Sequence, residues 1–432
     1  MIEKNITVKD GTLYFAGQNT LELAEKYGTP LYLLDEDLIR ENCRTYKNAV
    51  KKYFPEGSEA LYASKANSFK RIYEIMTEEG IGVDVASSGE IYTALKSGYD
   101  LSQAYFNSNN KTEEDVKYAI ENGIGYFVVD NKEEIDMIQE EAERQDLKQK
   151  VFLRLTPGVD PHTYEAISTG KVDSKFGSAI ETGQAEEITK YTLTKENVIL
   201  SGFHCHVGSQ VFEEDVFEKC AVVMLNFISL IEKSYGHKTE ILDLGGGYGV
   251  RYTEEDGYLD IEEKIKSVGD TVKSTCEELG ITPPKVYLEP GRSIVGNAGM
   301  TLYTVGSVKI IPEYKNYVSV DGGMTDNPRF ALYGARYTVL LANKMDEEKD
   351  FVASVVGRLC ESGDKIQENV SLPSSVCKGD ILAVCTTGAY NYSMASNYNR
   401  LQRPPIVMLK NKTESYIAVK RESLEDIVRN DV

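Results

Sequence analysis

The segment Ala60-Leu61-Tyr62-Ala63-Ser64-Lys65-Ala66-Asn67 places a lysine at the end of an apolar run that has the composition of a buried β-strand. The ordinary outcome is a lysine that extends past the strand end and keeps its amine in water. Alternatively, partial desolvation lowers the pKa of the amine, which can then act as a nucleophile or form a Schiff base. Lys65 is therefore a candidate reactive residue. Other segments of the chain decide between a solvated lysine and a reactive amine.

This segment is the first of eight strand-like runs, each followed by a stretch of helical period. The runs begin near Ala60, Gly82, Ala104, Gly125, Lys150, Ile199, Glu240 and Lys285. Helix signals between them include apolar positions from Ile72 that stop at Gly80, and Thr112 as an N-cap with a stop at Gly123. Eight strand-helix units predict a (β/α)8 TIM barrel over residues 34–292, although a doubly wound sheet also alternates in this way.

The two ends of the chain have a different pattern. Residues 5–15 alternate apolar and polar positions around Asp10-Gly11, which predicts a hairpin. After about residue 300, β-type runs follow one another with few helical periods between them. They cover Thr301 to Ile311, Tyr317 to Val320, Phe351 to Val356, Asp380 to Cys385 and Ser415 to Val419. We therefore expect a C-terminal β domain of sandwich or barrel type over residues 293–432, which also takes in N-terminal strands from residues 1–33.

Composition excludes several classes of partner. The 432 residues carry 48 Lys and Arg against 68 Asp and Glu, a net charge of −20 that repels nucleic acid and anionic membranes. Seven scattered cysteines without a Cys-x-x-Cys pair support neither a disulfide framework nor a zinc knuckle. The N-terminus lacks a basic and apolar leader, and the longest apolar span, Cys220 to Ile231, is too short to cross a bilayer. We expect a cytoplasmic protein with no nucleic-acid or membrane partner.

Two loops after the seventh and eighth strands indicate an anion site. The first contains the triplet Gly245-Gly246-Gly247, and the second is Glu289-Pro290-Gly291-Arg292-Ser293. Phosphate commonly binds to these two loops of a TIM barrel, because backbone N–H groups without a neighbouring Cβ can approach it closely. A glycine triplet alone is more often a plain turn, but two such loops on adjacent strand ends favour a phosphate site.

Glu289 follows the apolar run Val286-Tyr287-Leu288. A buried carboxylate without compensation would cost several kcal/mol, so it requires a proton or a cation. The ring nitrogen of pyridoxal phosphate would satisfy it, because an acidic partner keeps the pyridine protonated and able to accept electrons from a carbanion. The alternative is an ordinary salt bridge to Arg292.

The sixth strand ends with two histidines, His204 and His206, whose spacing directs both to the same side of the strand. A metal pair would need further ligands, and the only other histidines of the chain are His162 and His237. We therefore expect no metal. An imidazole packed against a cofactor ring, with Ser209 donating to its phosphate, fits the strand-end position better.

Together these motifs resemble those of the fold-type III pyridoxal-phosphate decarboxylases, the group that includes alanine racemase and ornithine decarboxylase. The resemblance covers nearly the whole chain. It runs in order through Tyr62 to Asn67, Gly202 to Gln210, Gly245 to Gly247, Glu289 to Arg292, Asp321 to Met324, Cys360 to Asp364 and Gly388 to Tyr390. The chain departs from the family pattern at residues 107–111, where a glycine is common, and at residues 399–404.

The resemblance implies a role for each candidate residue around the cofactor. Lys65 would carry pyridoxal phosphate as a Schiff base, Glu289 would pair with the ring nitrogen, and His206 would stack on the ring, oriented by Asp84. Further residues would line the cofactor and its phosphate, namely Ser209, Gly245, Gly246, Gly247, Pro290, Gly291, Arg292 and Tyr390.

The resemblance also implies a substrate whose distal end is itself an amino acid. Such a substrate needs a clamp for the distal carboxylate and an acid for the distal ammonium. The residues expected to bind it are Arg292, Arg329, Tyr333, Glu361 and Tyr390. We expect decarboxylation of meso-2,6-diaminopimelate to L-lysine and CO2, with another carboxylate-bearing diamino substrate such as carboxynorspermidine as the alternative. A cofactor carrier, a metal-dependent barrel hydrolase and a racemase of the same fold type are the competing functions.

Cys360 has two interpretations. Cysteine is often buried and inert. In the family that the chain resembles, this cysteine reaches across a dimer interface and is the proton donor after CO2 leaves. The same loop would bring Glu361 into the partner's site. The resemblance thus implies a homodimer whose active sites are each built from two chains.

Overall fold

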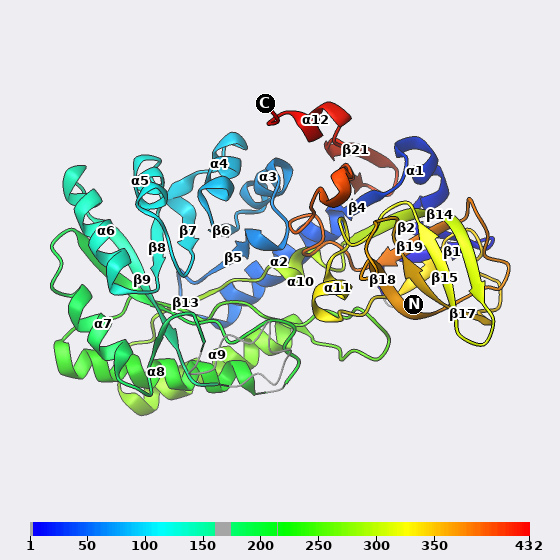
Figure 1. Cartoon of the computed structure of the whole chain (residues 1–432). Helices are drawn as coiled ribbons and strands as arrows, with labels where there is room; N and C mark the ends of the chain where they lie inside the picture. Colours follow the sequence, from blue (N-terminus) through cyan, green and yellow to red (C-terminus); the bar gives the residue numbers. More distant parts are fainter. Residues whose placement is uncertain (1–2, 160–173, 214) are drawn as a thin grey trace. The chain divides into compact units, whose positions relative to one another are not determined.

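The computed structural model describes residues 3–159, 174–213 and 215–432. The chain forms two compact units, shown in Figure 1. One consists of Cys43–Gly249 and Tyr258–Gly291, and the other of Met1–Asn42, Val250–Gly257 and Arg292–Val432. The domain limits expected after residues 33 and 292 stay a prediction.

The first unit contains a closed barrel of eight parallel strands. They are β5 (Glu59–Ala63), β6 (Gly82–Val85), β7 (Ala104–Asn107), β8 (Tyr126–Val129), β9 (Gln149–Thr156), β11 (Val198–His204), β12 (Ile241–Asp243) and β13 (Lys285–Leu288). Pairing of β13 with β5 and of β8 with β9 closes the ring, and the short β10 (Ser178–Ala179) adds to β9. Every strand begins within one residue of its predicted start, and the predicted (β/α)8 barrel is confirmed.

Helices follow the strands, as Figure 1 shows for α3 to α6 beside β5 to β9. Their bounds are α2 (Glu36–Tyr53), α3 (Lys70–Glu79), α4 (Ser88–Lys96), α5 (Glu113–Glu121), α6 (Lys132–Arg144), α7 (Gln184–Thr192), α8 (Val216–Tyr235) and α9 (Ile261–Leu279). Gly80 ends α3 in the left-handed conformation (φ 64°). Thr112 and Asp115 form a capping box at the start of α5, so both predicted helix signals are confirmed.

Aromatic side chains fill the barrel interior. Tyr105 stacks on Tyr126 with ring centroids 4.6 Å apart, and Phe152 and Tyr287 pack against Tyr105. Leu61, Val128 and Ile241 complete this cluster. The interior is thus a packed layer, as expected for a TIM barrel, and chemistry is confined to the strand ends.

The second unit is built mainly of β-strands. The strands are β1 (Ile6–Lys9), β2 (Thr12–Phe15), β3 (Gln18–Asn19), β4 (Leu31–Asp35), β14 (Gly299–Ile311), β15 (Lys315–Val320), β16 (Val339–Leu341), β17 (Phe351–Val356), β18 (Lys365–Leu372), β19 (Ile381–Cys385), β20 (Ile406–Lys410) and β21 (Glu414–Val419). The short helices are α1 (Thr20–Tyr27), α10 (Arg292–Val295), α11 (Arg329–Tyr333) and α12 (Leu424–Val428).

Both chain ends contribute to this unit, as predicted. The hairpin β1–β2 turns at Asp10 and Gly11, which both have positive φ, the geometry of a two-residue hairpin turn. The N-terminal strand β4 lies between β14 and β20 in the main sheet. The long β14 also pairs with β19 and then with β15, so it joins the two buried apolar clusters of the unit.

Within the described residues, no helix is both long and apolar enough to span a membrane.

Candidate active site

Lys65 lies in a 3-10 turn, Ser64–Ala66, directly after β5. The turn is anchored by Glu90, whose Oε2 accepts from the Ser64 hydroxyl (2.6 Å) and from the Ala86 N–H (2.7 Å). Ser64 and Ala66 are buried, whereas the Lys65 side chain is exposed at the strand end. The partial desolvation expected for Lys65 is therefore not seen in this chain, where the residue is exposed.

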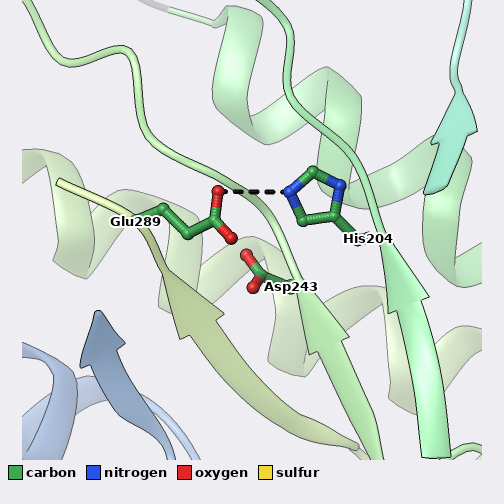
Figure 2. A group of neighbouring side chains, drawn as sticks. All are labelled: His204, Asp243 and Glu289. Carbon is green, nitrogen blue, oxygen red and sulfur yellow. Dashed lines mark hydrogen bonds and ion pairs between the residues drawn. The ribbon is translucent and has the colours of Figure 1, made fainter. Parts of the chain in front are cut away.

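Three buried polar side chains meet where β11, β12 and β13 end. Figure 2 shows His204, Asp243 and Glu289, which come from these three adjacent strands. His204 Nε2 lies 3.1 Å from Glu289 Oε2, and the two side chains are 0% and 4% exposed. Asp243 Oδ1 accepts from the Gly245 N–H at 2.8 Å. His204 thus hydrogen-bonds to Glu289, a contact that the sequence did not predict.

The charge state of this group follows from its surroundings. Burial alone would raise the pKa of Glu289, but His204, Lys65 and His206 lower it to about 2. Burial lowers the pKa of His204 below its usual value despite the neighbouring Glu289. Burial and the charge of Glu289 hold the pKa of Asp243 well above its usual value. At neutral pH Glu289 is therefore an ionised carboxylate beside a neutral imidazole, and the surroundings of Asp243 shift its pKa toward the neutral acid.

His206 is held by the glycine triplet. Its Nδ1 accepts from the Gly246 N–H at 3.2 Å, and burial together with the charges of Lys65 and Arg154 keeps its pKa well below the usual range. A Cβ on Gly246 would lie 2.0 Å from the Glu289 carbonyl oxygen, which only glycine avoids. Two N–H groups of the triplet therefore donate to side chains of the protein itself: the Gly245 N–H to Asp243 and the Gly246 N–H to His206.

Two further barrel residues belong to this site although sequence reasoning missed them. Arg154 on β9 is buried, and its Nη1 donates to Asn107 Oδ1 at 3.3 Å. The charges of Asp130, Glu289 and Asp84 act on this guanidinium. Asn107 lies in the segment that departs from the family pattern, and that departure was the only signal that could have marked it.

Asp84 lies on β6 and interacts electrostatically with Glu289. Burial and the charge of Glu289 raise its pKa well above the usual value, while Lys65 opposes this effect. Its Oδ1 has no hydrogen-bond partner among the residues that the structure describes. The expected role of Asp84 in orienting His206 stays a prediction.

The remaining barrel candidates occupy the same strand ends. Ser209 is half-buried in the loop after β11. The Pro290 carbonyl accepts from the Ala63 N–H at 3.1 Å, and a Cβ on Gly291 would lie 3.1 Å from Ala63. The loop after β13 is therefore packed closely against the end of β5, the strand that precedes Lys65.

In the second unit, two arginines lie among tyrosines. Arg292 Nη1 donates to the Tyr252 hydroxyl at 2.6 Å, and its guanidinium lies 4.9 Å from the Tyr390 ring centroid. Arg329 Nη1 donates to the Tyr337 hydroxyl at 2.7 Å, and the Arg329 Cζ lies 5.1 Å from the Tyr252 ring centroid. The sequence predicted Arg292, Arg329 and Tyr390, but Tyr252 and Tyr337 lie in segments without a recognisable motif.

This group is cationic and buried. Burial would raise the pKa of Tyr252, but Arg292 and Arg329 more than offset it and lower the pKa below its usual value. Arg292 and Arg329 are 5% and 7% exposed. Buried guanidiniums that donate to phenol groups suit the binding of a carboxylate or a phosphate.

Three candidates lie outside this cluster. Tyr333 is half-buried at the end of α11, the helix that begins with Arg329. Cys360 and Glu361 are exposed in the loop between β17 and β18, where the Cys360 N–H donates to Asn399 Oδ1 at 2.8 Å. The expectation of a silent buried cysteine is therefore wrong, because this loop presents the thiol to solvent.

The two remaining histidines do not add to the site. His162 lies outside the described residues, and His237 follows α8 in the turn before β12, at the opposite end of the strands from His204.

The strand-end group fits pyridoxal phosphate. Glu289 is an ionised, buried carboxylate at the strand end, the partner that a protonated ring nitrogen requires. Lys65 supplies an amine whose charge reaches Glu289, and glycine-lined loops follow β12 and β13. The fold and this set of groups define a pyridoxal-phosphate-dependent barrel enzyme.

Comparison with known proteins narrows this class. The family model described as pyridoxal-dependent decarboxylase, pyridoxal binding domain, matches residues 36–296. The chain is 44% identical to diaminopimelate decarboxylase of Bacillus subtilis over 98% of its length and 95% of the relative's. It is 45% identical to that of Staphylococcus aureus over 99% of its length and 100% of the relative's. A crystal structure of diaminopimelate decarboxylase from M. jannaschii in complex with L-lysine superposes with a TM-score of 0.91 at 34% identity, covering 100% of this chain and 99% of that one. The chain belongs to the diaminopimelate decarboxylase family.

Proposed function

We propose that this protein decarboxylates meso-2,6-diaminopimelate to L-lysine and CO2 with pyridoxal phosphate as cofactor. The observation that carries the proposal is the strand-end group, in which the Lys65 amine and the ionised Glu289 act on one another inside a single barrel mouth. A cofactor bound there supplies an aldehyde that captures an amine covalently and a ring that draws electrons from the carbon losing CO2.

The barrel residues would hold the cofactor in a fixed orientation. Lys65 would bond to it and later exchange places with the substrate amine. Glu289 would keep a proton on the ring nitrogen, and His206, neutral and fixed by the Gly246 N–H, would lie against the ring face. Asp84 would orient His206. Ser209, the glycine triplet, Pro290 and Gly291 would line the phosphate side, together with Arg292 and Tyr390.

The substrate would be selected at its distal end. Its distal carboxylate would bind to Arg329, Arg292, Tyr333 and Tyr390, because buried guanidiniums bind carboxylates in a planar, paired geometry. Its distal ammonium would bind to Glu361. A diamine-forming decarboxylase has no need of such arginines, so this cluster favours a substrate that is an amino acid at both ends.

The active form would be a homodimer. The exposed loop that carries Cys360 and Glu361 would enter the partner's site, where Cys360 would return a proton to the carbon that lost CO2. Each site would then need two chains.

The test is CO2 release from meso-diaminopimelate, ornithine, arginine and carboxynorspermidine by the purified holoenzyme. We expect release from meso-diaminopimelate with L-lysine as product and little from the other three. Preference for carboxynorspermidine, or racemisation without CO2, would refute the proposal.

Replacement of Lys65 tests the covalent role. Lys65→Ala should abolish turnover, and borohydride reduction followed by peptide mapping should place the cofactor on Lys65 in the wild type. The matched control is Lys70→Ala, which removes a nearby exposed lysine and should leave both results unchanged. Full activity in Lys65→Ala would contradict this role.

A further inference from the structure

Asp243 and Glu289 lie side by side (Figure 2), and each has one carboxylate oxygen without a hydrogen-bond partner among the described residues. One oxygen of each carboxyl is engaged, Asp243 Oδ1 by the Gly245 N–H and Glu289 Oε2 by His204 Nε2. The other two, Asp243 Oδ2 and Glu289 Oε1, are buried without a partner among the described residues. Figure 2 shows one oxygen of Asp243 facing the Glu289 oxygen that His204 does not contact. One polar atom from each of His204, Asp243 and Glu289 lies within 4.8 Å of the other two.

Two buried acceptor oxygens that face one another require a proton between them. Two ionised carboxylates in such a place would repel strongly, and each bare oxygen would lack compensation for its lost hydration. If one of the two oxygens carries a proton, its O–H can donate to the other oxygen, and both then have a hydrogen-bond partner. The close approach of the two side chains is therefore explained if one of them is a neutral acid.

The surroundings indicate which side chain holds the proton. Glu289 Oε2 lies 3.1 Å from His204 Nε2, and His204 and Lys65 both favour the charged form of Glu289. Asp243 receives one N–H and faces a carboxylate. The direction of the pKa shifts, downward for Glu289 and upward for Asp243, agrees with this assignment.

We propose that Asp243 is a positioning residue that carries a proton at neutral pH and donates it in a hydrogen bond to Glu289. His204 and Asp243 then hold the Glu289 carboxylate between two neutral donors. The other oxygen of Asp243 binds Gly245, so one side chain couples the acid to the glycine triplet. The inference rests on the proposed function, in which Glu289 faces the ring nitrogen of the cofactor.

A bound cation is the alternative. His204, Asp243 and Glu289 could each offer one ligand atom to a metal ion. Asp243 would then be ionised, and an amide in its place would be a poor ligand. Substitution by asparagine therefore separates the two possibilities, because an asparagine amide can accept from Gly245 and donate to Glu289 as a protonated acid does.

The experiment compares Asp243→Asn with Asp243→Leu, which has a similar shape but no donor. The infrared spectrum of the wild type should contain the carbonyl stretch of a protonated Asp243, and this band should be absent from Asp243→Asn. The control is Asp326→Asn, which removes another buried acid and should retain the Asp243 band. Asp243→Asn should keep its cofactor dissociation constant and kcat/KM within about threefold of wild type. Asp243→Leu should weaken cofactor binding by about 10- to 100-fold, the effect of an unsatisfied buried hydrogen-bonding group.

The proposal is overturned if Asp243→Asn leaves the acid band unchanged, or binds cofactor as poorly as Asp243→Leu. It is also overturned if the wild type contains one metal ion per chain that Asp243→Asn loses. If Asp243→Leu fails to fold, the infrared comparison and the cofactor affinity of Asp243→Asn still decide. An acid band without CO2 release would refute the proposed function alone, whereas CO2 release without the band would refute the role of Asp243 alone.

Discussion

At the scale of single residues, Arg329 is expected to decide which substrate is accepted. Its guanidinium donates to Tyr337 and lies over the Tyr252 ring. Lysine keeps the charge but lacks the planar fork. Arg329→Lys should lower kcat/KM for meso-diaminopimelate by about 100-fold, while the low activity with ornithine changes little. Steady-state kinetics with both substrates check this, and an equal loss with both would show that Arg329 supports the fold instead.

Asp326 is a second residue whose replacement should have a measurable effect, in this case on the stability of the fold. Burial raises its pKa to about 7, although the Tyr303 hydroxyl and the Gly323 N–H donate to it. Since the folded pKa exceeds the unfolded value, this group's contribution to stability is complete below about pH 4 and is lost as the pH rises through about 7. Between pH 4 and 8, Asp326→Asn should gain up to about 4 kcal/mol in unfolding free energy relative to wild type. Urea unfolding across this range measures the difference, and a constant difference would contradict the shift.

At the scale of elements, Lys111 joins two βα units. Its buried Nζ donates to the Ser108 and Val128 carbonyls (2.8 and 2.7 Å) and to Glu134 Oε2 (3.2 Å). The Glu134 carboxylate, at the start of α6, also accepts from the backbone N–H groups of Lys111 and Asp130. The loop before α5, the end of β8 and the start of α6 are thereby held together at the edge of the barrel that carries the site.

Removal of this lysine should be costly because it leaves a buried carboxylate without its cation. We expect Lys111→Met to lower the unfolding free energy by about 3 kcal/mol. The double variant Lys111→Met with Glu134→Gln should lose less, since no uncompensated charge remains. Denaturant unfolding of Lys111→Met, Glu134→Gln and the double variant measures the coupling, and additive losses would show that the pair does not interact.

At the scale of the whole molecule, the proposed sharing of each active site by two chains predicts that two inactive chains restore one another's activity. A mixture of Lys65→Ala and Cys360→Ala chains, unfolded and refolded together, should recover roughly a quarter of wild-type activity, because half the dimers contain one intact site of two. Cys360→Ala mixed with Glu361→Ala is the matched control and should not recover, since both changes lie in the same loop. Absence of recovery in the first mixture would show that Lys65 and Cys360 act within one chain.

Much of the fold was predictable because its signals are local. The eight strand starts, the capping box at Thr112, the Gly80 stop and the turn at Asp10-Gly11 each depend on residues within one turn or one strand of each other. The strands β16, β18 and β20 were missed, since their short or mixed runs acquire strand structure by pairing with distant partners such as β19, β17 and β4.

The sequence by itself determined the alternation of strands and helices, and hence the barrel, and it placed Lys65, His206 and Glu289 at strand ends. Only the tertiary structure decided what lies beside them. His204, Asp243 and Glu289 are far apart in the chain and meet because three parallel strands end in register, and Tyr252 and Tyr337 surround Arg329 without any shared motif. The physical reason is that periodicity and capping are properties of neighbours along the chain, whereas charge state and hydrogen bonding depend on burial among residues that only the closed fold brings together.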